Sequence, residues 1–139
     1  MIQYRQWRTA SDKLKLDLFD RRYKVLDSTL ALLSTSIKAG KPTWDEIGKF
    51  QNSVLEARFL FRADLVLWLR AVESNAEGIV RNAKKANEIS SMNDRSDQDQ
   101  KKLEKLLDKR QLNFSHLEKS LHELESRFSP YLSSAHVKS

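Results

Sequence analysis

Large apolar side chains recur at alternating intervals of three and four residues between Leu16 and Ile37. This spacing aligns them along one stripe of a long helix. The stripe consists of Leu16, Phe19, Tyr23, Leu26, Leu30, Leu33 and Ile37. A stripe so regular is typical of a helix that packs against other helices. We therefore expect these seven side chains to face the core of a helical bundle.

The helix that carries this stripe is predicted over residues 11–39. Ser11 or Asp12 can accept the free amide hydrogens of a first turn. Gly40 can adopt the left-handed conformation that ends a helix, and Pro42 prevents the helix from continuing.

A second helix is predicted over residues 43–61. Thr43 and Glu46 have the spacing of a capping box, in which each side chain bonds the backbone N–H of the other residue. Apolar residues then follow at the same three-and-four spacing, namely Ile47, Phe50, Val54, Ala57 and Phe61. This helix is therefore expected to bury one face.

The segment Phe59–Leu60–Phe61 has two interpretations. It is too apolar for an exposed loop, so it can form a corner packed into the core, with Asp64 as the N-cap of a third helix. Alternatively, one helix runs straight through, because no glycine or proline forces a break. The third helix is predicted over residues 64–89. Its stripe holds Leu65, Trp68, Val72, either Ala76 or Ile79, Ala83 and Ala86. Gly78 weakens the helix by about 1 kcal/mol relative to alanine.

A polar linker, Ser90 to Gln100, precedes a fourth helix predicted over residues 98–128 and ended by Ser129–Pro130. Its stripe holds Leu103, Leu107, Phe114, Leu117, Leu121, Leu124 and Phe128, with Arg110 at one apolar position. Four matching helices predict an all-α fold, an antiparallel four-helix bundle. The bundle domain is expected over residues 11–132, after a basic and aromatic segment 1–10 and before a disordered tail 133–139.

The composition supports long helices. The 139 residues include three glycines and two prolines, too few for a strand-and-turn fold, and 40 % of them are hydrophobic. Cysteine is absent from the sequence, which excludes disulfides, thiolate metal sites and cysteine nucleophiles. No run of about 18 apolar residues occurs, so the sequence predicts no transmembrane helix.

The positive charge is concentrated at the N-terminus. Residues 1–24 hold seven basic and three acidic side chains, a net +4 of the chain's +6. Within them, aromatic residues alternate with arginines at Tyr4, Arg5, Trp7 and Arg8. This mixture is typical of a membrane interface, and these four residues are a candidate membrane or anchor contact. The same segment can equally be a frayed helix start, with Trp7 covering the end of the bundle.

Catalytic, cofactor and metal sites are not predicted. His116 and His122 are six residues apart, which places them on different faces of a helix, so both are expected at the surface. Glycine-rich phosphate loops, nucleophile elbows and His-Glu-x-x-His motifs are absent from the sequence. We therefore expect no cofactor and no enzymatic activity.

Ionic pairing is expected at three places. Asp17 with Arg21 and Asp20 with Lys24 have the i,i+4 spacing of surface ion pairs. Arg22 borders the apolar stripe of the first helix, and Glu56 borders that of the second. We therefore predict an ion pair between Arg22 and Glu56 at the edge of the core.

Three segments of the chain resemble a set of uncharacterised small bacterial helical proteins. They are residues 6–25, residues 56–61 and residues 127–132 (RFSPYL). Those proteins usually have one N-terminal transmembrane helix followed by a cytoplasmic helical domain. The resemblance implies such a helix before Tyr4, and whether one precedes Met1 in the native protein is open. It carries no activity and hence no functional residues.

Together, these features favour a non-enzymatic, membrane-proximal helical domain that acts through contacts with a protein partner. An anionic membrane surface is the expected contact of its N-terminus, and a cytoplasmic location is expected. Self-association also stays open, because apolar stripe residues that the bundle does not cover can be buried in a dimer. The alternative is a nucleic-acid-binding protein that uses the basic face of the first helix. It is less favoured because Asp12, Asp17 and Asp20 interrupt that face.

Overall fold

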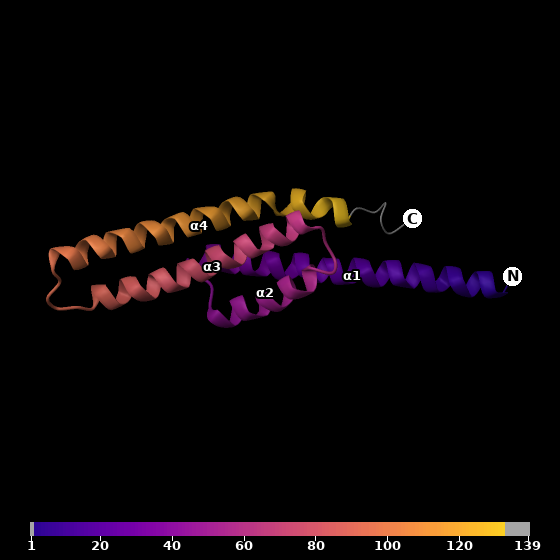
Figure 1. Cartoon of the computed structure of the whole chain (residues 1–139), viewed down its shortest axis with the longest axis horizontal. Helices are drawn as coiled ribbons and strands as arrows, with labels where there is room; N and C mark the ends of the chain where they lie inside the picture. Colours follow the sequence, from indigo (N-terminus) through magenta and orange to yellow (C-terminus); the bar gives the residue numbers. More distant parts are fainter. Residues whose placement is uncertain (1, 133–139) are drawn as a thin grey trace.

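Four helices make up the structure, a computed structural model that describes residues 2–132, with side chains from Thr9 onward. They are α1 (Ile2–Ala39), α2 (Trp44–Ala57), α3 (Ala63–Ser90) and α4 (Asp97–Leu132). Each helix packs against its neighbours in sequence, and α1 also packs against α4 (Figure 1). The predicted all-α antiparallel four-helix bundle is thus confirmed.

The ends of the bundle differ from a compact four-helix block. α1 projects past the other helices on the side of the N-terminus, and the α3–α4 hairpin projects past α1 and α2 on the opposite side (Figure 1). The predicted start of α1 at Ser11 or Asp12 is wrong, because the helix begins at Ile2. Residues 2–10 contain no glycine or proline, so nothing stops the helix from extending through them.

The connection between α1 and α2 is the one that the sequence predicts. Gly40 has a φ of 84°, a left-handed conformation that only glycine adopts without strain. The Thr43 hydroxyl accepts from the Glu46 N–H at 3.2 Å, and the Glu46 carboxylate accepts from the Thr43 N–H at 3.2 Å. This complete capping box fixes the start of α2.

The corner between α2 and α3 is confirmed as well. The predicted end of α2 at Phe61 is wrong, because the helix ends at Ala57 and the chain turns there into the corner. Leu60 and Phe61 are buried in it, while Phe59 is exposed. The prediction that Asp64 caps α3 is wrong: the N-cap is Arg62, which makes no side-chain capping bond. Its backbone N–H instead donates to the Tyr131 hydroxyl at 3.3 Å, so the end of α4 helps to hold the corner.

α4 continues beyond its predicted end at Phe128 and reaches Leu132, with Pro130 inside the helix. A proline so near a helix end removes few hydrogen bonds. Tyr131 and Leu132 pack against the main core, which favours the continued helix. The predicted disordered tail, residues 133–139, lies outside the described residues.

The core is built from the predicted faces of α2 and α3. The buried apolar side chains of these two helices are Ile47, Phe50, Val54, Ala57, Leu65, Val66, Trp68, Leu69, Val72, Ala76, Ile79, Ala83, Ala86 and Ile89. α4 adds Leu117, Leu124 and Phe128 to the same core. Its Leu107 was predicted to be buried but is exposed, and Leu106 is buried in its place. Leu106 and Leu103 join Ala86 and Ile89 in a second, smaller core within the α3–α4 hairpin.

The predicted buried face of α1 is wrong. Of its seven stripe residues only Leu33 is fully buried, and Leu16, Tyr23 and Leu30 are exposed. The face in contact with the bundle is rotated by about one residue, roughly 100°. It consists of Val25, Thr29, Leu32, Leu33 and Ser36. The buried hydroxyls are satisfied locally, since Thr29 donates to the Val25 carbonyl and Ser36 to the Leu32 carbonyl, each within 2.7 Å.

Gly78 on α3 lies directly opposite Asn113 on α4. A Cβ added to Gly78 would lie 2.9 Å from Asn113 Cγ, closer than carbon atoms can approach. Gly48 in α2, by contrast, has open space around it. The glycine that weakens α3 as an isolated helix therefore permits its close contact with α4.

The first prediction separates these two roles of Gly78. In an Asn113→Ala background, Gly78→Ala should stabilise the protein by up to about 1 kcal/mol, the difference in helix propensity. In the natural background that gain should be lost or reversed, because overpacking costs about 1–3 kcal/mol. The measurement is the free energy of unfolding in urea. Gly48→Ala is the control and should be equally favourable in both backgrounds. Equal effects of Gly78→Ala in the two backgrounds would contradict the close approach.

Candidate functional site

Arg22 connects three parts of the bundle. Its Nε donates to the carbonyl oxygen of Leu60 at 3.0 Å, which joins α1 to the α2–α3 corner. Its guanidinium carbon lies 5.9 Å from the ring centre of Phe61 and 5.3 Å from that of Tyr131. Both distances are within the range of cation–π attraction. We call this arrangement the Arg22 corner.

An aromatic cluster extends the Arg22 corner into the core. The Phe61 ring makes edge-to-face contacts with Tyr131 and Phe128, with centres 4.9 Å and 5.4 Å apart. Trp68 contacts Phe128 in the same way at 6.2 Å. Such pairs add about 0.5–1.5 kcal/mol each beyond the burial of their area. The end of α4 is therefore fixed against the corner.

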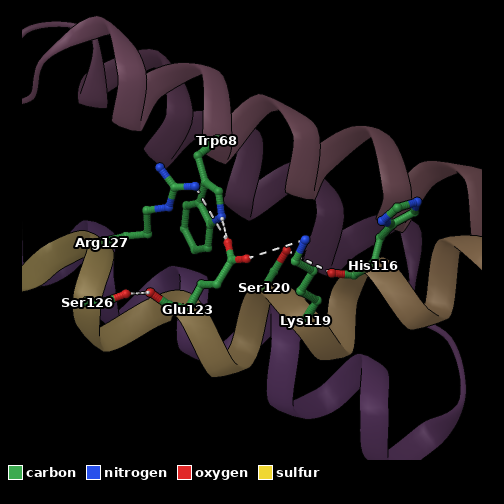
Figure 2. Close-up of polar contacts among 7 residues, drawn as sticks. All are labelled: Trp68, His116, Lys119, Ser120, Glu123, Ser126 and Arg127. Atoms are coloured by element: carbon green, nitrogen blue, oxygen red, sulfur yellow. Dashed lines mark hydrogen bonds and ion pairs between the residues drawn. The ribbon is translucent and has the colours of Figure 1, made fainter.

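Glu123 supports this cluster from the side of α4. Its carboxylate accepts from the Trp68 indole N–H at 3.1 Å and lies between Lys119 and Arg127, at 3.9 Å and 3.7 Å (Figure 2). The Arg127 guanidinium also lies 6.0 Å from the Trp68 ring. Within the close-up, Ser120 and Ser126 donate to backbone carbonyls about one turn earlier (Figure 2). The network positions Trp68, and the Glu123 carboxylate is already engaged by these three neighbours.

An open cavity of about 680 Å³ lies beside the Arg22 corner. Three arginines line it (Arg22, Arg62 and Arg127), with Asp64 as the opposing charge. The cavity has an excess of positive charge and suits an anionic group better than a cationic one. Arg22, however, already bonds the Leu60 carbonyl and contacts two rings, so we assign Arg22 a structural role.

The predicted ion pair between Arg22 and Glu56 is not among the ion pairs of the described side chains. Arg22 turns to the Leu60 carbonyl and the two rings, and Glu56 is exposed. The pairing of Asp17 with Arg21 is present at 3.2 Å, between side chains that are more than half exposed. The predicted pair of Asp20 with Lys24 is not among the ion pairs of the described side chains. The partners of Arg22 come from residues 38 and more positions away, which sequence spacing does not reveal.

An apolar groove of about 420 Å³ runs between α1 and α4. Its apolar walls are Tyr23, Leu26 and Leu30 from α1 and Leu124, Phe128 and Leu132 from α4, and its charged residues are Asp27 and Glu125. The α1 wall belongs to the stripe that was predicted to be buried. The surface that sequence reasoning assigned to the core is therefore available for contacts outside the chain.

A second groove, of about 380 Å³, lies on the α3–α4 hairpin. Four lysines line it, Lys85 from α3 and Lys102, Lys105 and Lys109 from α4, together with Glu88. The ion pairs of the described side chains involve other residues. The spacing of the three α4 lysines places them on one face of the helix, a signal that sequence analysis could have used.

The candidate membrane contact lies at the start of α1. Tyr4, Arg5, Trp7 and Arg8 belong to the described helix, but their side chains lie outside the described part. Immediately after them, Leu14 is 69 % exposed and Leu16 is 51 % exposed. None of the four helices, as far as the structure describes them, has the length and apolar character that crossing a bilayer requires.

The titratable groups offer little chemistry. His116 and His122 are exposed, as predicted, and the described residues contain no group of three or more potential metal ligands. Burial, together with the neighbouring Glu77 carboxylate, raises the pKa of Glu73 on α3. Glu73 lines neither the Arg22 corner nor the α1–α4 groove. Glu73 therefore lies on the side of α3 that faces α2, where Gln51 donates to the neighbouring Glu77.

The second prediction tests the Arg22 corner. Arg22→Ala should lower the free energy of unfolding by roughly 1–3 kcal/mol, because the Leu60 carbonyl loses its donor and two rings lose their cation. Arg21→Ala, which removes one exposed ion pair, is the matched control and should change stability by less than about 1 kcal/mol. Urea denaturation of both variants provides the comparison. Equal losses at the two neighbouring positions would refute the structural role of Arg22.

Comparisons of this chain with protein families, characterised proteins and solved structures found no match. The resemblance to small bacterial helical proteins therefore stays a prediction. Any functional assignment depends on the surfaces described above.

Proposed function

We propose that the protein is a non-enzymatic helical interaction domain, held at the cytoplasmic face of a membrane, that acts through protein contacts. The observation that carries this proposal is the projection of α1 beyond the bundle (Figure 1). We call residues 2–14 the α1 extension. It precedes the point at which the end of α4 reaches α1, where Lys15, Leu18 and Tyr131 line a small cavity.

The α1 extension needs a partner outside the bundle. An isolated helix of about 13 residues is marginal in water, and most helices in proteins owe their stability to tertiary packing. Leu14, within the extension, leaves most of its surface exposed. A helix that projects past the other helices and exposes a leucine is expected to be stabilised by what it binds (Figure 1).

An anionic membrane surface suits the sequence of the α1 extension. Within it, Tyr4 and Trp7 are residue types enriched at membrane interfaces. Arg5, Arg8 and Lys13 supply the positive charge that anionic lipids attract, at about 1 kcal/mol for each residue near the surface. Leucine beside basic residues on one helix is also the composition of interfacial amphipathic helices.

The third prediction concerns binding to vesicles. The full chain should co-sediment with vesicles of mixed phosphatidylserine and phosphatidylcholine. The triple substitution Arg5→Gln, Arg8→Gln and Lys13→Gln should weaken that binding by roughly 100-fold, from the loss of three such charges. The matched control, which removes three lysines elsewhere, is Lys41→Gln, Lys84→Gln and Lys101→Gln, and it should bind nearly as well as the natural chain. Negligible binding by all three proteins would overturn the membrane part of the proposal.

A second candidate function, nucleic-acid binding, is favoured by one observation. The lysine groove of the α3–α4 hairpin gathers Lys85, Lys102, Lys105 and Lys109 on a projecting part of the molecule. Lysines without acidic partners are suited to phosphate contacts. The site differs from the face of the first helix on which this alternative was predicted. It ranks second because Glu88 lies in the same groove and would repel a phosphate.

The fourth prediction tests this candidate by gel shift. If the groove binds nucleic acid, Lys102→Glu with Lys105→Glu should abolish a shift of DNA or RNA that weakens steeply with salt. The reversals Lys13→Glu and Lys24→Glu on α1, which remove the same charge, should leave that shift in place. Absence of any salt-dependent shift for the natural chain would dispose of the candidate.

A further inference from the structure

Three residues of the most regular apolar stripe of α1 face away from the bundle, although Leu33 of the same stripe is buried. Leu16, Tyr23 and Leu30 follow one another at intervals of seven residues and are 51 %, 52 % and 41 % exposed. Phe19 and Leu26 lie between them and are half-buried. The bundle instead covers the face that holds Thr29 and Ser36. α1 buries two hydroxyl residues while Leu16, Tyr23 and Leu30 stay exposed, so it has an apolar surface that this chain alone does not cover.

The seven-residue repeat identifies the kind of partner. Apolar residues at the first and fourth positions of successive heptads form the contact face of a coiled coil, and the facing surface is another helix. Here the first positions are Leu16, Tyr23 and Leu30, and the fourth positions are Phe19 and Leu26. We propose that this stripe is the contact face of a parallel homodimer, in which α1 pairs with α1 of a second copy.

Charges on the two sides of the stripe favour a second copy in parallel orientation. One side holds Lys15 and Arg22, and the other holds Asp20 and Asp27. In a parallel coiled coil, each residue on the first side lies opposite the residue five positions later on the second side of the partner. Lys15 then lies opposite Asp20, whereas Arg22 already bonds the Leu60 carbonyl of its own chain. In an antiparallel pair Asp20 would lie opposite Asp27, which is repulsive.

The α1–α4 groove gives the partner helix a second surface to pack on. Leu124, Phe128 and Leu132 of α4 continue the apolar wall that begins with Tyr23 and Leu30. A helix placed against the stripe therefore contacts both α1 and α4. The inference rests on the proposed function, in which α1 is the docking helix, and it names the protein partner as a second copy. A parallel pair also directs both α1 extensions toward the same surface.

The fifth prediction concerns the mass in solution. Sedimentation velocity of the full chain should give a dimer, twice 16.2 kDa. The variant Tyr23→Glu with Leu30→Glu should be a monomer, while its circular dichroism and thermal transition show that the bundle remains folded. The control Leu67→Glu with Leu112→Glu places the same charges on comparably exposed leucines of α3 and α4 and should remain dimeric. A monomeric natural chain at about 100 µM, where typical specific complexes form, would overturn the proposal.

A single cysteine tests the orientation, since the sequence has none. Leu16→Cys should form an interchain disulfide on mild oxidation, because parallel helices bring the two copies of residue 16 together. An antiparallel pair would place residue 16 beside residue 33, and the absence of cross-linking in a dimer would overturn the parallel orientation. Vesicle binding is measured on the same samples. A monomer that binds vesicles refutes the dimer alone, and a dimer that does not bind them refutes the membrane part of the proposed function.

Discussion

The structure depends on how the corner between α2 and α3 is held. Phe59 on the outside of the corner is exposed, and the Leu60 carbonyl lies beyond the last turn of α2. Among the described residues, no backbone N–H donates to this carbonyl. Arg22 supplies that donor from α1, and Tyr131 accepts the N–H of Arg62 from the end of α4. Both bonds come from helices far away in sequence. The corner therefore forms together with the packing of α1 and α4, which is why no helix of this bundle is independent of the others.

The sequence predicts the architecture well where a helix has one apolar face. α2 and α3 each have a single stripe, so Ile47, Phe50, Trp68 and Val72 could be assigned to the core from spacing alone. The Thr43 capping box and the left-handed Gly40 were also predictable, because each depends only on residues within one turn.

The predictions fail where a helix has two apolar faces or where contacts are distant in sequence. α1 offers the bundle either its heptad stripe or the face of Val25 and Leu32, and spacing cannot rank them. The outcome places Thr29 in the core, which is inexpensive because its hydroxyl bonds the preceding turn. The contact between Trp68 and Glu123 spans 55 residues and has no local signal. The stripe that misidentified the core is the same stripe that we propose as a dimer contact.

The small core of the α3–α4 hairpin has a consequence for the dynamics of the molecule. Ala86, Ile89, Leu103 and Leu106 form a cluster separate from the main core, and α1 and α2 do not reach it (Figure 1). Local opening of a protein costs less where fewer apolar contacts must be broken. The amide hydrogens around the 91–96 loop should therefore exchange with solvent at lower free energy than those beside Leu69 or Leu117. We therefore expect the lysine-bearing tip to loosen while the bundle stays intact.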